Sequence, residues 1–187
     1  MIYNERTQRH EQVVASARQM LTAARTAPKA RGVDIIEAIL VEGDDLKILA
    51  DKMVEIGNER NRPSFIRDAS NVLQAECIVA IGTRYQSLGL NCGHCGFATC
   101  VERENSQLST LNSQLFEVPC SLNSIDVGIA VGSACATAAD LRLDTRVMYS
   151  IGVAVEQLGW IGEGIHLTMG IAVSASSKNP FFDRPTK

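Results

Sequence analysis

The sequence predicts a single domain in which helices and strands alternate. Segments whose apolar residues recur at helical spacing alternate with short apolar runs rich in β-branched residues, which is the pattern of helices and strands in one mixed fold. The chain has 187 residues, the usual length of one domain, and 45% of them are hydrophobic, enough for a globular core. A run of cysteines near the middle of the chain is the third observation, and it predicts a bound metal ion or cluster.

Two helices and a strand are expected in the first third of the chain. Over Asn4–Arg25 the apolar residues lie three and four positions apart, which predicts an amphipathic helix that ends before Pro28. The run Asp34–Val41 is short, apolar and partly β-branched, as in a buried strand. A turn at Gly43 then precedes a second helix over residues 46–54.

The middle of the chain continues the alternation. A third helix over Ser64–Ala75 leads into a second buried strand over Cys77–Gly82. After the cysteine run, the composition of Val101–Leu115 is compatible with a helix. The segment Val127–Leu141 is dense in glycine, alanine and valine, which predicts a buried helix that starts near Ser124.

The last part of the chain predicts one more helix, one strand and an extended arm. A helix is expected over Asp144–Leu158 with Gly159 after its end, and a strand over Ile165–Val173. The tail Ser176–Arg184 carries two phenylalanines, and prolines at 180 and 185 exclude a helix there. We expect this apolar arm to dock on its own domain or on a partner subunit.

Charge and hydropathy argue against two function classes. Charged residues are 21% of the chain and the net charge is -3, so the sequence shows no basic surface for nucleic acid. Charges or glycines interrupt the apolar runs well before eighteen residues, so we expect no membrane-spanning segment. No apolar targeting segment follows the start, and the cysteines look like ligands or buried thiols, so we expect the reducing cytoplasm.

Four cysteines have the spacing of a metal or cluster site. Cys92, Cys95 and Cys100 fall in one glycine-containing run as C-x2-C-x4-C, and Pro119-Cys120 follows nineteen residues later. Glycines let such a loop turn tightly and present backbone N–H groups to the sulfurs. A three-cysteine loop with a remote fourth cysteine after a proline favours an iron–sulfur cluster.

Two other interpretations of these sulfurs stay open. A disulfide framework suits small secreted domains, whereas this chain is long enough to build a core without one. A structural zinc site usually draws on two short cysteine pairs, and only one pair is present here, although His94 could replace a thiolate. Cys77 and Cys135 lie in buried-looking segments and are expected to be packing thiols.

The remaining polar residues indicate no catalytic site. The three histidines, His10, His94 and His166, have no spacing that implies a shared site. Four charged residues in or beside the predicted buried helices could line a pocket, but helix caps and ion pairs explain them more simply. They are Asp126, Asp140, Asp144 and Arg146. The single tryptophan, Trp160, is expected to anchor the core or an interface.

Four segments together resemble one prokaryotic family. They are the Cys92–Cys120 loop and the segments Asp126–Ala134, Asp144–Gly152 and Lys178–Arg184. We expect the match itself to extend over nearly the whole chain. This combination resembles the family described as ferredoxin-domain-containing proteins. The resemblance implies a 4Fe-4S cluster held by Cys92, Cys95, Cys100 and Cys120, and it implies no particular reaction.

The order of the elements is similar to that of the flavin-dependent nitroreductase family. This resemblance implies an α+β sandwich, with a mostly antiparallel sheet flanked by helices, in an intertwined homodimer that holds FMN. Residues 85–122 would then be a cysteine-rich insertion. Basic residues of the first helix and the C-terminal region would bind the flavin phosphate, although Glu5-Arg-Thr-Gln-Arg9 stands where the family has Arg-Arg-Ser-x-Arg. The corresponding residues here are Arg6, Arg9, Lys178 and Arg184.

The sequence thus supports two function hypotheses. In the first, the chain is a redox protein whose cluster passes single electrons, through a flavin at a dimer interface, to a small substrate. In the second, a cluster or zinc ion only staples a loop, and the protein is a binding or scaffold module.

Overall fold

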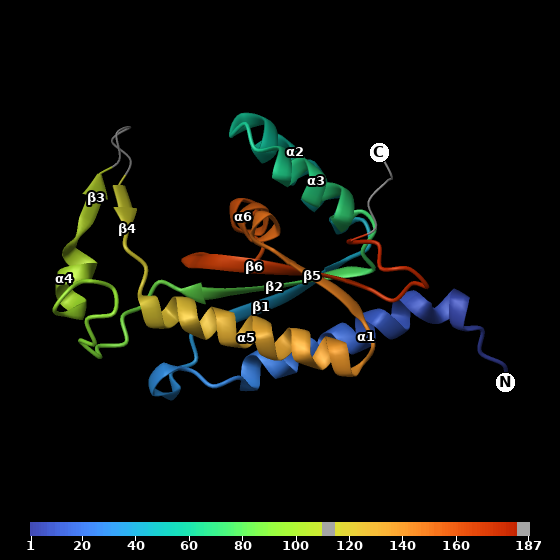
Figure 1. Cartoon of the computed structure of the whole chain (residues 1–187), viewed down its shortest axis with the longest axis horizontal. Coiled ribbons are helices and arrows are strands. Elements are labelled where there is room, and N and C mark those ends of the chain that lie inside the picture. The colour runs from blue at the N-terminus through green and yellow to red at the C-terminus, as the bar shows by residue number, and fades with distance from the viewer. Residues whose placement is uncertain (110–114, 183–187) are drawn as a thin grey trace.

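A four-stranded antiparallel sheet forms the centre of the molecule (Figure 1). The structure, a computed structural model, describes residues 1–109 and 115–182. The strands lie in the order β1-β2-β6-β5, and the three neighbouring pairs are antiparallel. Their bounds are β1 Ile36–Glu42, β2 Cys77–Arg84, β5 Asp144–Met148 and β6 Ile165–Ser174. The predicted α+β sandwich with a mostly antiparallel sheet is confirmed.

Helices cover both faces of this sheet (Figure 1). One face carries α1 (Glu5–Thr26) and α5 (Ser121–Asp140), which pack against each other. The other face carries α2 (Asp45–Glu59), α3 (Pro63–Val72) and α6 (Tyr149–Gln157). A short 3-10 turn, η1 (Ala30–Gly32), joins α1 to β1.

The central strand β2 shows how the sequence builds both layers. Side chains alternate between the two faces of a strand, and those of β2 are buried on both. Ile78 and Ala80 join the core beneath α2, α3 and α6, whereas Val79 and Ile81 join the core beneath α1 and α5. A continuous apolar run therefore marks the strand that holds the two layers together.

The prediction of one helix over Asp144–Leu158 is wrong in its first part. Residues Asp144–Met148 form β5, and the helix begins only at Tyr149. Asp144 resembles a helix cap in the sequence, but β5 pairs with residues 170–174 of β6. The paired residues lie more than twenty positions apart in the sequence, so a local pattern does not reveal this pairing.

The prediction of a helix over Val101–Leu115 is also wrong beyond its first turns. Helix α4 covers only Cys100–Asn105, and β3 (Gln107–Ser109) and β4 (Leu115–Glu117) then form a two-stranded sheet. Part of the predicted helix, residues 110–114, lies outside the described residues. The described residues of the segment 85–122 lie between the end of β2 and the start of α5 in the chain and stand at one end of the main sheet (Figure 1).

The C-terminal arm docks on its own domain. Phe181 is 2% exposed and belongs to the core beneath α2, α3 and α6. The Phe181 carbonyl accepts a hydrogen bond from Arg146 Nη1 at 2.8 Å, and Asn179 Nδ2 donates to Asp144 Oδ1 at 3.0 Å. Trp160 packs against the same core, in agreement with the expectation that it anchors the core or an interface.

Helix α6 crosses β6 at very short range. A Cβ atom placed on Gly152 would lie 1.6 Å from the Thr168 carbonyl oxygen, so the helix backbone rests directly on the strand. On the strand side, a Cβ atom on Gly170 would lie 2.1 Å from the Ile151 side chain. Only glycine fits at this crossing.

Helix α5 is the most apolar helix of the described residues. It is long and apolar enough, by length and composition only, to cross a membrane. Gly128 and Gly132 do not interrupt this helix, so the expectation that charges or glycines break every apolar run before eighteen residues is wrong for α5. Seven of its residues are buried against the rest of the protein. Packing on the sheet and on α1 therefore buries one face of α5, whereas Ile125 and Ile129 stay exposed on another.

Candidate functional site

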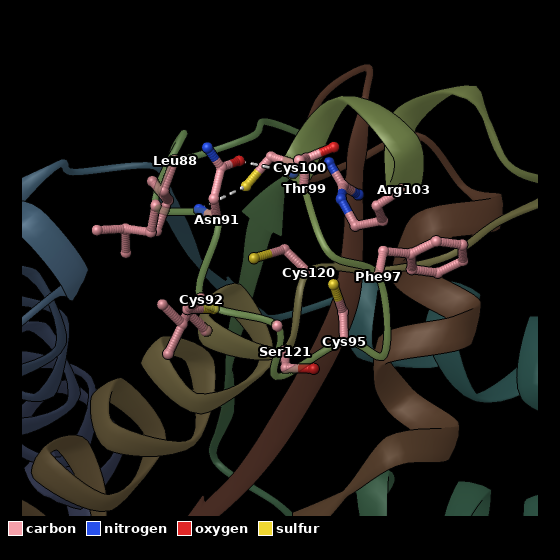
Figure 2. Close-up of a pocket in the computed structure, with 13 residues that line it drawn as sticks. Leu88, Asn91, Cys92, Cys95, Phe97, Thr99, Cys100, Arg103, Cys120 and Ser121 are labelled. Carbon is pink, nitrogen blue, oxygen red and sulfur yellow. Dashed lines mark hydrogen bonds between the residues drawn. The ribbon is translucent and has the colours of Figure 1, made fainter.

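The fold brings the four predicted cysteine ligands to one cavity at the end of the sheet (Figure 2). Cys92 and Cys95 lie in the loop that follows β2, Cys100 is the first residue of α4, and Cys120 is the N-cap of α5. Cys120 is buried, Cys95 and Cys100 are half-buried, and Cys92 is exposed. All six cysteines of the chain are free thiols, so no disulfide competes for these sulfurs.

The glycines of the loop shape this arrangement. Gly93 has a φ of 73° and Gly96 a φ of 88°, in the left-handed region that glycine adopts without steric cost. The Gly96 N–H donates to the Gly93 carbonyl at 2.9 Å, which closes a tight turn around Cys95. The turn allows two cysteines three residues apart to face one cavity.

Cys100 lies in a polar surrounding that favours its thiolate. The Asn91 backbone N–H donates to Cys100 Sγ at 3.3 Å, and the Cys100 N–H donates to Asn91 Oδ1 at 2.8 Å. Hydrogen bonds from the Ser87 side chain first, and then from backbone N–H groups such as that of Asn91, lower the pKa of the Cys100 thiol. A thiolate is the form that binds metal, so these donors suit a ligand.

The four thiols line one cavity but, in their described positions, do not form a site for a single metal ion. Among the described residues, no three Cys, His, Asp or Glu side chains stand close enough to hold one metal ion. Four sulfurs bound tetrahedrally to zinc at about 2.3 Å would lie only about 3.8 Å apart. The four thiols surround the cavity without meeting at one point (Figure 2). His94 is exposed and does not line the cavity, and its carbonyl accepts a hydrogen bond from Ser121 Oγ at 3.1 Å.

Two residues of the cavity wall have roles that the sequence did not reveal. The Asn91 backbone N–H donates to the Cys100 sulfur and the Asn91 side-chain oxygen accepts from the Cys100 N–H. Arg103 lines the cavity from α4. Thr99 and Glu102 form a capping box at the start of α4. The pattern Thr-x-x-Glu is visible in the sequence and indicates where this helix begins.

The loop between α1 and β1 is tied to the cysteine segment. Both carboxylate oxygens of Asp126 accept the Ala30 N–H, at 3.0 and 3.1 Å, and burial raises the pKa of Asp126. Arg31 Nη1 donates to the Leu88 carbonyl at 2.6 Å. Asp126 therefore fixes a loop. Asp144 and Arg146 hold the C-terminal arm and Asp140 is exposed, so these four residues do not form one pocket.

Cys77 and Cys135 lie outside the cavity. Cys77 is fully buried between the sheet and α1, and burial raises the pKa of its thiol to about 12. Cys135 packs against the same core from α5, and burial also raises the pKa of its thiol. Both thiols stay protonated at neutral pH, in agreement with a packing role.

A larger groove of about 540 Å³ lies beside the first turns of α1 and the end of α5. Arg9 lines it, although Glu5 pairs with Arg9 Nε at 2.6 Å. Arg142, which follows α5, supplies a second guanidinium that the sequence analysis missed. Arg6 and Lys178 are exposed and do not line the groove. Arg184 lies outside the described residues.

Solved structures with this fold include flavoproteins. A nitroreductase with bound FMN from Desulfitobacterium hafniense DCB-2 has a TM-score of 0.58 and 12% identity, with 88% of this chain and 78% of that chain covered. A BluB-like flavoprotein from Clostridium difficile 630 has a TM-score of 0.52 and 17% identity, with 92% and 84% covered. At these identities the similarity shows the fold, which is nitroreductase-like.

Two sequence comparisons concern the family. Residues 117–184 match the family described as uncharacterized protein containing a ferredoxin domain, a region that includes Cys120 but not the other three cysteines of the cavity. An uncharacterized protein of Archaeoglobus fulgidus is 40% identical over 189 residues, covering both chains completely. Because the similarity extends over the full length of that relative, the chain belongs to this family of ferredoxin-domain-containing proteins.

Proposed function

We propose that the protein is an iron–sulfur redox protein that holds a 4Fe-4S cluster with Cys92, Cys95, Cys100 and Cys120. The observation that supports this function best is the convergence of four free thiols from three separate segments on one cavity. The family description, which names a ferredoxin domain, agrees with it. A bound 4Fe-4S cluster supplies reversible one-electron transfer.

The residues around the cavity prepare the thiols for this role. Asn91 donates to the Cys100 sulfur and orients the start of α4. Cys120 stands at the N-terminus of the 20-residue helix α5, so the positive end of the helix dipole would face a negatively charged cluster bound there. Leu88, Leu90 and Phe97 add apolar side chains to the cavity wall. The reducing cytoplasm is the compartment in which free thiols of this kind persist.

The groove beside α1 is the site that we propose for FMN. Arg9 and Arg142 offer two guanidinium groups for the phosphate, and Val13, Leu141 and Leu143 give an apolar floor. The FMN-bound nitroreductase with this fold supports the choice of cofactor. FMN would combine single electrons into two-electron transfer to a small substrate. Arg6 and Lys178 would reach the phosphate only through a rearrangement or from a second copy.

Metal and flavin analysis of anaerobically purified protein tests this function. We expect about four iron and four sulfide per chain, with broad absorbance near about 400 nm that dithionite bleaches. We expect FMN to be released on denaturation. Zinc in place of iron would contradict the electron-transfer function and favour a structural metal site. Iron and sulfide without FMN, in protein that also binds none on titration, would contradict the flavin part alone.

We also propose that the protein is a homodimer that packs through the outer face of α5. Ile125 and Ile129 are 50% and 39% exposed on this face. Gly128 and Gly132 lie on the same face at helical spacing, and a Cβ atom added to either glycine would meet no atom within 4 Å. Glycine in an exposed helix lowers helix stability, and close packing of another backbone would offset that cost. A second copy of α5 would bury this apolar surface.

Ile125→Glu is expected to convert the dimer into a monomer, because it places a charge in the centre of the proposed contact. Sedimentation velocity of the iron-loaded protein measures the change. Ile48→Glu is the matched control, since Ile48 is 48% exposed on α2 on the other side of the sheet. Equal sedimentation of the two variants would contradict the proposed interface.

A further inference from the structure

The most unusual charged residue of the molecule is Arg103, which lies beside the cysteine cavity. Its side chain is 1% exposed, and it is the largest fully buried side chain among the described residues. It belongs to α4 and lines the cavity together with the four cysteines (Figure 2). Removing a guanidinium group from water is costly unless charges and hydrogen bonds compensate for it.

The protein compensates for this charge only in part. Arg103 Nη1 donates to the Val118 carbonyl at 2.8 Å, and the guanidinium carbon lies 4.8 Å from the centre of the Tyr85 ring. Arg103 Nη2 reaches Glu104 Oε1 at 3.4 Å, but Glu104 is 41% exposed. A long ion pair to an exposed carboxylate contributes little. Arg103 Nε is buried and has no hydrogen-bond partner within the described part of the chain.

A cluster bound in the cavity would supply the negative charge that Arg103 lacks. Four thiolates bound to iron give the site a net negative charge, and the cavity they line is the one that Arg103 lines. We propose that Arg103 is the countercharge of the cluster and raises its reduction potential. This inference rests on the proposed function, because it requires a redox cluster at the four cysteines.

The direction of the effect follows from electrostatics. Reduction by one electron adds one negative charge to the site. A fixed positive charge in a water-poor surrounding stabilises the reduced form more than the oxidised form. Arginine suits this role because its guanidinium stays charged at any pH that proteins tolerate, even when it is buried. The contact with the Tyr85 ring holds the group in place without neutralising it.

A purely structural role for Arg103 predicts something different. The Val118 carbonyl also accepts a hydrogen bond from Tyr85 Oη at 3.1 Å, so Arg103, Tyr85 and Val118 connect α4, the end of β2 and the segment before Cys120. If Arg103 only fastened these segments, its removal would lower the stability of the protein and leave the potential unchanged. The two roles are therefore separable by experiment.

The first experiment is an anaerobic redox titration of the iron-loaded protein, followed by absorbance and electron paramagnetic resonance. Arg103→Gln is expected to lower the equilibrium constant for reduction at least tenfold, which is about 59 mV for a one-electron couple. Arg103→Lys keeps the positive charge and is expected to restore at least half of the lost potential. An unchanged potential in an iron-loaded Arg103→Gln variant would overturn the inference while leaving the proposed function intact.

A surface arginine provides the control. Arg60 is exposed at the end of α2, in the helical layer on the far side of the sheet from α5. Arg60→Gln removes the same charge from a place where water and salt screen it. We expect its potential to equal that of the wild type. A shift as large as that of Arg103→Gln would mean that only net charge matters, which also overturns the inference.

The second experiment covers the case in which Arg103→Gln fails to take up iron. Urea unfolding of the cluster-free proteins compares wild type with Arg103→Met, which removes the charge and keeps much of the volume. Without the cluster the buried charge lacks its countercharge, so we expect the Arg103→Met variant to be at least as stable as the wild type. A clear loss of stability would indicate a structural staple and overturn the inference. Wild-type protein without a redox-active cluster would instead overturn the proposed function.

Discussion

Cys120→Ser is expected to abolish cluster binding while it leaves α5 intact or makes it more stable. Cys120 is the N-cap of α5 and makes no side-chain capping hydrogen bond. Serine is among the preferred N-cap residues and contributes about 1 kcal/mol there. The substitution therefore removes a ligand but improves a helix start. We expect iron to fall from about four to fewer than about one per chain, and the midpoint of urea unfolding of the cluster-free protein to be equal or higher.

Cys135→Ser is the matched control, because Cys135 lies on the same helix but outside the cavity. Its iron content should equal that of the wild type. If Cys120→Ser kept its full iron content, Cys120 would not be a ligand and the cavity would need another fourth donor. If the cluster-free Cys120→Ser protein failed to fold, Cys120 would serve the core and not the metal.

Gly152→Ala is expected to have the largest effect on stability of any single methyl addition in the chain. The added Cβ atom would lie 1.6 Å from the carbonyl oxygen of Thr168, which is a backbone atom that cannot rotate away. Helix α6 would have to move off β6 and open the core beneath it. We expect a loss of about 3 kcal/mol or more in the free energy of unfolding, measured by urea titration followed by circular dichroism.

Gly128→Ala adds the same methyl group where no atom lies within 4 Å. It should raise the free energy of unfolding by about 0.5–1 kcal/mol, because alanine favours a helix over glycine. Gly128 lies on the proposed dimer face, so both glycine substitutions are compared in the Ile125→Glu background, in which we expect a monomer. Similar losses at the two positions would show that α6 does not rest on the β6 backbone.

Local sequence patterns correctly predicted the elements whose own residues show which faces are buried. The helix expected over Asn4–Arg25 is α1 within one residue at each end, because one apolar stripe defines it. The strand expected over Cys77–Gly82 is β2, which extends two residues further. The residues of this run are apolar on both faces of the strand, and a short continuous apolar run is typical of a strand that is buried on both faces.

The elements that failed depend on distant residues. Strand β5 exists because Thr145 and Val147 pair with Val173 and Ile171 of β6, and nothing in Asp144–Met148 itself distinguishes a strand from a helix start. The helix predicted over Val101–Leu115 ends at Asn105, where the chain begins a hairpin. Tertiary contacts override a weak local preference in both cases.

The candidate site divides in the same way. The spacing of Cys92, Cys95, Cys100 and Cys120 predicted that they would lie together, and all four line one cavity, while their role as ligands stays a prediction. The place of Arg103 beside them was not predictable, because Val-Glu-Arg-Glu-Asn reads as an exposed charged helix. Its burial arises only when α4 docks against Tyr85 and Val118. The groove is likewise formed by residues of α1 and of the α5–β5 connection, more than a hundred residues apart.

The length of α5 constrains how far an electron must travel. Its 20 residues span about 30 Å, with Cys120 at the start and the groove near Arg142 just past the end. Within one chain, the two proposed cofactors would therefore sit at opposite ends of a long rod, a distance over which direct electron transfer is slow. If two copies pack with their α5 helices antiparallel, the cysteine end of each rod lies beside the groove end of the other. Electrons would then pass from the cluster of one subunit to the FMN of the other, and a single subunit would hold both cofactors too far apart for rapid transfer.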